Sequence, residues 1–251
     1  MLKKEPKIVF HHIPKCGGTS VVTGMVLSYY PFRVLKYRRQ GFSSHLNSRA
    51  SSVIAEQSGV NRYDFRRQLL HYFVEKGDQP YIAGHYPFDE QLYTTHHHEW
   101  NFVTLLRDPV ARWYSEYFWN RYKNHDYQKT ETSIEEYIET EQGKMNARSF
   151  VNFLSHSDKH SETPTDKEVG EAMENLKKMR VIGCLEHMDK FCADMKDQFG
   201  RKPIIWNRNA SPASAEQKIL PDTNSVIHKR VLDLTRSDQE IYRAAKDIIG
   251  V

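Results

Sequence analysis

The chain has 251 residues, of which 39% are hydrophobic and 27% are charged, and its formal net charge is +4. These values are ordinary for a globular protein, and the length suits one large α/β domain or two small ones. We expect a single domain over residues 1–251. So small a positive charge gives no reason to expect a nucleic-acid partner, but it is compatible with an anionic ligand.

Cys16, Cys184 and Cys192 form no close pair in the sequence, so we expect no disulfide framework and a reducing compartment. No apolar run approaches the ~18 residues of a membrane-spanning helix. The first predicted strand also starts too early to leave room for a signal peptide. The sequence therefore predicts a cytoplasmic protein with no membrane span, unless an N-terminal anchor is missing from it.

Short apolar runs alternate with amphipathic stretches along the chain. The apolar runs predict strands, in chain order, at 7–13, 81–85, 101–106, 181–184 and 204–206. The amphipathic stretches predict helices at 18–30, 64–75, 110–121, 133–141, 145–154, 166–178 and 187–199, and two more within 223–249. Residues 33–63 are predicted to be an irregular insertion, and residues 124–132 a loop. The alternation predicts an α/β fold with a central, mostly parallel sheet flanked by helices on both faces.

Lys15, His85 and Arg107 each stand at the end of a predicted strand. In open parallel sheets, ligands bind beyond the carboxyl ends of the strands. If these three strands are neighbours in the sheet, the three side chains converge on one crevice.

The segment after the first strand, "PKCGGTS", has the composition of an anion-binding site. A helix that starts at Gly18 presents backbone N–H groups at its N-terminus, and Gly17 and Gly18 let the backbone approach an anion closely. Thr19 and Ser20 add hydroxyl donors, and Lys15 adds a positive charge. The segment therefore predicts a phosphate or sulfate site, although a plain tight turn with a helix cap is the simpler alternative.

The usual nucleoside-triphosphate loop, G-x-x-x-x-G-K-[ST], differs from this segment. Here the first glycine is missing, and the lysine precedes the glycines instead of following them. We also identify no strand-end aspartate that would hold Mg²⁺. The sequence favours a phosphate-bearing ligand bound without a metal, and a nucleotide kinase or related phosphotransferase is the alternative.

His85 and Arg107 each have a functional and a simpler interpretation. A histidine titrates near neutrality, so His85 can act as a general base, although the chain has 13 histidines and most of them need no such role. The Arg107 guanidinium precedes a helix capped by Asp108 and can grip a phosphate, which Ser115, two helical turns further on, can also reach. The simpler alternative is an ion pair between Arg107 and Asp108. Core packing is expected for Trp113, Tyr114, Tyr117 and Phe118.

These segments resemble the motifs of one family. "FHHIPKCGGTS" resembles the 5′-phosphosulfate loop of the carbohydrate sulfotransferases, which include the heparan sulfate and uronyl 2-O-sulfotransferases. "LLRDPVARWYSEY" is similar to their 3′-phosphate motif, R-D-P-x-x-R-x-x-S-x-Y, and "AGHYPF" is similar to their glycine–histidine segment. Weaker similarities extend over nearly the whole chain. The resemblance implies sulfotransferase family 2, a P-loop-like three-layer sandwich, and 3′-phosphoadenosine 5′-phosphosulfate (PAPS) as the sulfuryl donor.

Carried over residue by residue, the resemblance implies the following roles. Lys15 contacts the bridging oxygen of the sulfuryl group, and His85 removes the proton of the acceptor hydroxyl as a general base. Arg107 and Ser115 bind the 3′-phosphate. The 5′-phosphate is held by Cys16, Gly17, Gly18, Thr19 and Ser20. The product is 3′-phosphoadenosine 5′-phosphate (PAP), no metal is required, and the acceptor is a hydroxyl-bearing compound, which we expect to be a glycan or glycoconjugate.

The sequence departs from the family pattern at two positions. Cys16 stands where threonine is usual, so backbone N–H groups are expected to make that contact. Ala83 precedes Gly84, so His85 is expected to act without the second histidine that some relatives have in this segment. A later segment is expected to close over the cofactor through Arg208, Asn209 and Ser211.

A non-catalytic polyanion-binding protein is a third hypothesis. Basic residues in and after the predicted insertion can form one face, or can recognise an acidic acceptor of the sulfotransferase, although such charges are usually just solvated. These residues are Arg33, Lys36, Arg38, Arg39, Arg49, Arg62, Arg66 and Arg67. The sequence determines neither the acceptor, nor the hydroxyl that is sulfated, nor the oligomeric state.

Overall fold

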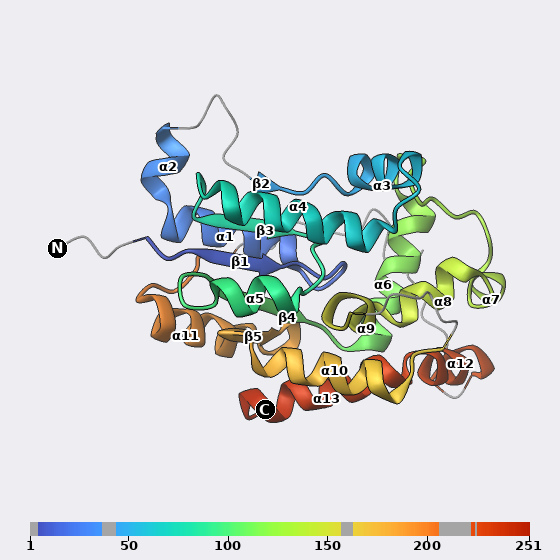
Figure 1. Cartoon of the computed structure of the whole chain (residues 1–251). Helices are drawn as coiled ribbons and strands as arrows, with labels where there is room; N and C mark the ends of the chain where they lie inside the picture. The colour runs from blue at the N-terminus through green and yellow to red at the C-terminus, as the bar shows by residue number, and fades with distance from the viewer. Residues whose placement is uncertain (1–4, 37–43, 157–162, 206–221, 224) are drawn as a thin grey trace.

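The protein folds around a parallel five-stranded sheet, seen in the computed structural model, which describes residues 5–36, 44–156, 163–205, 222–223 and 225–251 (Figure 1). The strand order is β2-β3-β1-β4-β5, and every neighbouring pair is parallel. The strands are β1 (Ile8–His11), β2 (Ser44–His45), β3 (Tyr81–Gly84), β4 (Asn101–Leu106) and β5 (Val181–Cys184). Four of the five strands expected from the sequence are thus present, and the predicted α/β fold is confirmed.

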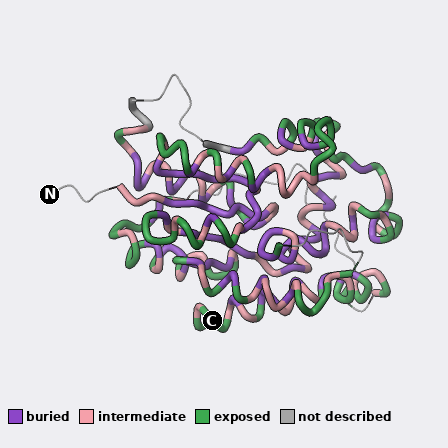
Figure 2. The backbone as a smooth tube through the Cα atoms, viewed as in Figure 1, coloured by how far each residue is buried: buried purple, intermediate pink, exposed green. Residues whose placement is uncertain are grey.

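Helices cover both faces of the sheet and make it the middle of three layers. On one face, α1 (Gly18–Tyr29) and α11 (Met188–Phe199) pack their apolar side chains against the strands. The other face is covered by α4 (Arg62–Lys76), α5 (Glu90–His96), α9 (Ser149–Leu154), α10 (Asp166–Lys177) and α13 (Arg236–Ile249). Because both faces are covered, β1, β3 and β5 are buried along their whole length, as Figure 2 shows for the centre of the molecule.

A third apolar cluster lies beside the sheet. It joins α6 (Pro109–Tyr122), α7 (Ile134–Tyr137), α8 (Glu141–Ala147) and α12 (Val226–Leu234). Trp113, Tyr114, Tyr117 and Phe118 all belong to it, which confirms their expected core role. This cluster fixes α6 at the carboxyl end of β4, where its opposite side is available to a ligand.

The predicted irregular insertion at 33–63 is wrong for the residues that the structure describes there. This part of the chain contains most of α2 (Pro31–Lys36), β2, α3 (Ser48–Gln57) and the start of α4. The Asn47 side chain caps α3 by accepting a hydrogen bond from the Ala50 amide at 2.9 Å. The polar composition hid these elements because α3 buries only Ser51 and Ala55, and β2 is two residues long.

Two further predictions needed correction. The strand expected at 204–206 is wrong for Ile204 and Ile205, which lie outside any strand, and Trp206 falls outside the described residues. Ile204 instead uses its amide to donate to the Ser28 Oγ, at 3.0 Å. The helices expected at 133–141 and 145–154 are three shorter ones, α7, α8 and α9, because Thr140 caps a new helix inside the first of these ranges.

Within the described part of the chain, no helix combines the length and the apolar character needed to cross a bilayer. The three cysteines are buried free thiols. Residues 37–43 and 206–221 lie outside the described residues, and with them two expected groups of functional side chains. These are Arg38 and Arg39, and Arg208, Asn209 and Ser211.

Candidate active site

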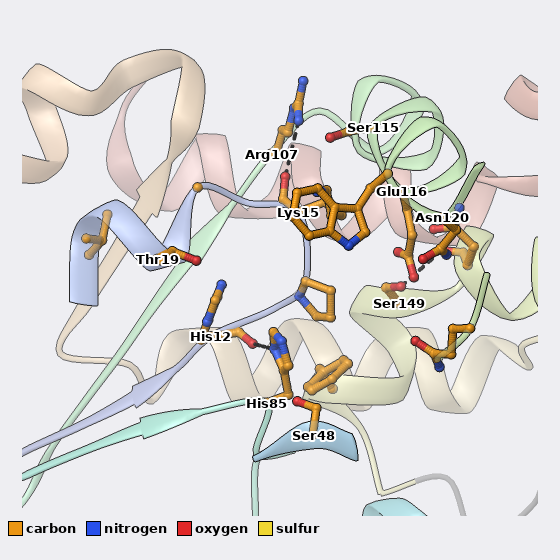
Figure 3. A pocket seen from close by; sticks show the side chains of 18 of the residues that line it. His12, Lys15, Thr19, Ser48, His85, Arg107, Ser115, Glu116, Asn120 and Ser149 are labelled. Atoms are coloured by element: carbon orange, nitrogen blue, oxygen red, sulfur yellow. Dashed lines mark hydrogen bonds between the residues drawn. The ribbon is translucent and has the colours of Figure 1, made fainter. Parts of the chain in front are cut away.

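A cavity of about 1660 Å³ opens where the chain leaves β1, β3 and β4. β1 lies between β3 and β4, so the three strands are neighbours, as the sequence argument required. Lys15, His85 and Arg107 follow these strands and all line the cavity (Figure 3). The other cavity-lining residues from the sequence prediction are Gly17, Gly18, Thr19, Ser20 and Ser115.

Cys16 is the one predicted site residue outside the cavity lining. Its side chain is fully buried in the apolar cluster under the sheet, and burial raises the pKa of its thiol to about 12. Its Sγ donates to the Pro14 carbonyl at 3.6 Å. The Cys16 side chain therefore points away from the cavity, and only its backbone is placed to meet a ligand.

The loop between β1 and α1 has a backbone that few sequences can adopt. Lys15 has φ 65° and Gly17, the residue before α1, has φ 76°, so both are in the left-handed region. A Cβ on Gly18 would lie 1.9 Å from the Cδ2 of His12, so only glycine fits there. The first turn of α1 contains no acidic residue. The loop thus presents the start of a helix, without a nearby carboxylate on that turn, to the cavity.

The Lys15 ammonium lies over the ring of Trp119, at 4.1 Å from the centroid. Burial lowers the pKa of Lys15 to about 8. The Glu116 carboxylate opposes this shift, whereas Arg107 and Lys123 add to it because they are also cationic. Lys15 is therefore an ammonium that gives up its proton more readily than an ordinary lysine.

The orientation of His85 is set by the backbone of the loop that leads to Lys15. Its Nδ1 lies 2.5 Å from the His12 carbonyl oxygen. A carbonyl only accepts, so Nδ1 carries the proton in the neutral ring and the lone pair is on Nε2. The His12 ring lies beside that of His85, with 4.5 Å between centroids. The sequence suggested no second histidine for His85, but the structure supplies one from another segment.

Arg107 ties the ends of two neighbouring strands together. Its Nη1 donates to the Lys15 carbonyl oxygen at 3.2 Å. The alternative partner, Asp108, instead caps α6 by accepting from the Ala111 amide at 2.8 Å, and Arg107 forms no ion pair with any described carboxylate. Its guanidinium therefore still has donors for an anion.

The sequence argument missed four residues of α6 and of its C-terminal end that line the cavity: Glu116, Trp119, Asn120 and Lys123. The helical repeat could have found them, because they follow Ser115 at spacings that keep them on one side of the helix. The fully buried Arg112 donates from Nη1 to Glu116 Oε2 at 2.8 Å. The Lys123 ammonium donates to Asn120 Oδ1 at 2.7 Å, and burial lowers the pKa of Lys123 to about 8.

The far side of the cavity comes from α3, α4 and the loop after α6. Arg66 donates from Nη2 to the Ser48 carbonyl and to the Ser52 Oγ, both at 3.1 Å. The Tyr127 hydroxyl lies 2.9 Å from the same Ser52 Oγ. These contacts join three distant segments into one wall, on which Arg62 also lies.

The basic face proposed for the polyanion-binding hypothesis is not present among the described residues. Arg66 and Arg67 are buried, and Arg67 pairs with Asp64 at 2.7 Å. Arg33 pairs with Glu5 at 2.6 Å. Arg33, Arg66 and Arg67 therefore hold the fold together, and Arg62 and Arg66 line the cavity.

A comparison with protein families finds a match that covers most of the chain. The model of the sulfotransferase family 2, described as "Sulfotransferase family", matches residues 1–201. A search of curated proteins finds no match. The matched residues include every strand of the sheet and all the cavity residues that follow β1, β3 and β4. The chain therefore belongs to the sulfotransferase family.

Proposed function

We propose that this sulfotransferase moves the sulfuryl group of PAPS to a hydroxyl of an acceptor, which we expect to be a glycan or glycoconjugate. The observation that carries the proposal is the convergence of Lys15, His85 and Arg107 on one cavity at the ends of three neighbouring strands. The family match favours sulfuryl transfer over the nucleotide kinase alternative.

In this proposal the nucleotide lies between the loop after β1 and the start of α6. The N-terminus of α1 and the hydroxyls of Thr19 and Ser20 receive the 5′-phosphate, with the Cys16 amide in place of a side-chain donor. Arg107 and Ser115 receive the 3′-phosphate. A cavity lined by Lys15, Arg62, Arg66, Arg107 and Lys123 suits so anionic a ligand.

The proposed reaction is one in-line displacement at sulfur. His85 Nε2 takes the proton of the acceptor hydroxyl, and the oxygen forms the new S–O bond. The bond between sulfur and the bridging oxygen breaks, and its electron pair stays on the 5′-phosphate of PAP. Lys15 donates a hydrogen bond to that oxygen as its charge grows, and such charge stabilisation is commonly a large part of catalysis. The positive charge comes from side chains and amides, so the proposal includes no metal.

We further propose that the whole chain acts as one domain. The family match ends at residue 201, but α12 and α13 follow it and pack against the matched part. The buried Asp238 of α13 accepts hydrogen bonds from the Phe150 and Val151 amides at the start of α9. The C-terminal helix α13 is thus tied to α9. Helix α9 helps to form the cavity through Ser149 and Phe153.

Calorimetric titration with PAP in the absence of metal tests the proposed donor, beside ATP with Mg²⁺ as the control. Tight binding of PAP and weak binding of ATP are expected. A folded sample that binds ATP with Mg²⁺ but not PAP would overturn the proposal in favour of a phosphotransferase.

A further inference from the structure

The cavity contains an unusual carboxylate, Glu116, among the cations expected to receive the anionic donor. Glu116 directly follows Ser115, and its side chain is 20% exposed. Lys15, Arg107 and Lys123 line the same cavity, and none of them pairs with a described carboxylate within 4.0 Å. A negative charge weakens anion binding at such a place, so the carboxylate is expected to have another role.

Buried contacts hold Glu116 in position. The Arg112 guanidinium is completely buried and donates to Glu116 Oε2 at 2.8 Å. The same guanidinium donates to Asn146 Oδ1 at 2.7 Å, which fixes its plane. Figure 3 shows the Glu116 side chain gathered with those of Asn120 and Ser149 on one side of the cavity. The carboxylate is therefore a fixed charge and not a mobile surface group.

We propose that Glu116, held by Arg112, is a positioning residue that serves as the counter-charge of Lys15 and Lys123 and sets the upper pH limit for binding the anionic donor. This inference rests on the proposed sulfotransferase function of the same cavity. Glu116 acts through the lysines and need not touch the donor.

The charges around Lys15 and Lys123 show in which direction Glu116 shifts the pKa of the two lysines. Burial lowers the pKa of each lysine to about 8, and Glu116 raises the pKa of both. Arg107 and Lys123 lower the pKa of Lys15, and the Cys16 thiol raises it slightly. The histidines that line the same cavity are His12, His85 and His125. Glu116 itself pairs with Arg112, and its charge also raises the pKa of Arg62 and of Tyr137.

Without Glu116, each lysine would lose its proton at a lower pH. Binding of an anion requires the charged lysines, so affinity falls as the pH rises through their pKa. Glu116→Gln is therefore expected to move the midpoint of that fall downward by about one pH unit. Lys123→Gln removes a like charge from beside Lys15 and is expected to move the midpoint upward.

The test is a calorimetric titration with PAP at a series of pH values from about 6 to about 9.5, around the lysine pKa of about 8. Above the midpoint, Glu116→Gln should bind PAP up to about tenfold more weakly than the wild type, and below it at least as tightly. Glu116→Asp, which keeps the charge, should restore most of the wild-type profile. A purely structural role would weaken binding at every pH.

Glu141→Gln is the matched control. Glu141 also lines the cavity, but its side chain is 61% exposed and pairs with Arg148, so its pH profile should match the wild type. If Glu116→Gln does not fold, Glu116→Ala removes the same charge and decides the question by the same downward shift. An unchanged midpoint in the folded variants would overturn the inference. A wild-type protein that does not bind PAP at any pH would instead overturn the proposed function.

Discussion

The two halves of the cavity are built differently. The nucleotide half, where we propose that the donor binds, is formed mainly by short contiguous segments at strand ends, where the loop of Lys15, Gly17 and Gly18 leads into α1. The acceptor half, to which we assign the acceptor because it lies across the cavity from that loop, is formed by α3, α4 and the loop after α6, which are joined by Arg66 and Tyr127 through side-chain hydrogen bonds. Local backbone geometry therefore defines the first half, and contacts between distant segments define the second.

This difference indicates which substitutions should affect donor binding and acceptor binding separately. A change in the loop or at Arg107 should weaken the donor alone, because both are part of the nucleotide half. A change at Tyr127 should affect the acceptor alone. His85 lies where the halves meet, since its ring contacts His12 of the first half and Phe153 on the cavity wall, at 6.3 Å between ring centroids.

The largest expected effect is that of His85→Ala. Removal of the proposed general base should lower turnover by about 10²- to 10⁴-fold. Binding of PAP should stay within a few-fold of the wild type, because a base is not a donor ligand. Turnover with a good acceptor and calorimetric titration with PAP measure the two quantities. Wild-type turnover in His85→Ala would show that the base has been assigned wrongly.

Arg107→Ala should remove the proposed contact between the nucleotide half and the 3′-phosphate. A charge-assisted hydrogen bond contributes about 1.5–3 kcal/mol, so PAP affinity should fall by about 10- to 100-fold. AMP lacks the 3′-phosphate, and its affinity should change much less. Calorimetric titration of the variant with both ligands gives the comparison. Equal losses for PAP and AMP would mean that Arg107 acts through its hydrogen bond to the Lys15 carbonyl and does not bind the phosphate.

Gly18→Ala tests whether the backbone of the loop itself is required. The added Cβ would lie within 2.6 Å of three atoms of the His12 ring, and overpacking of this kind costs about 1–3 kcal/mol. PAP affinity should fall by about tenfold or more as the loop shifts. Gly170→Ala is the matched control, because a Cβ there meets nothing within 4 Å. Wild-type affinity in Gly18→Ala would show that the close approach of loop and ring is dispensable.

The smallest expected effect is that of Tyr127→Phe, in the acceptor half. The lost hydroxyl lies 2.9 Å from Ser52 Oγ and donates to the Ser48 carbonyl at 3.3 Å. A loss of about 0.5–1.5 kcal/mol should raise the acceptor KM by a few-fold and leave PAP affinity unchanged. Tyr72→Phe, on the exposed side of α4, is the control. A weaker affinity for PAP would show that the two halves are coupled through the loop after α6.

Much of the fold could be predicted because its signals are local. The apolar runs at 101–106 and 181–184 match β4 and β5 residue for residue. Asp108 and Pro109 marked the start of α6 correctly, since a side-chain cap and a proline at the first turn are local features. The insertion at 33–63 could not be interpreted in this way. Its α3 is polar and is fixed to α4 by the buried Arg66 guanidinium, a contact that only the folded chain provides.

The sequence by itself determined the three strand ends, the glycine-rich loop and the family, because each is encoded in contiguous residues. Only the tertiary structure decided that β1 lies between β3 and β4, which brings Lys15, His85 and Arg107 together. It also decided that His12 lies beside His85, and that the Cys16 side chain turns into the core. The physical reason is that burial and charge depend on distance in space. Burial lowers the pKa of Lys15, and Glu116, about one hundred positions away in the sequence, partly opposes that shift; no local pattern contains that pair.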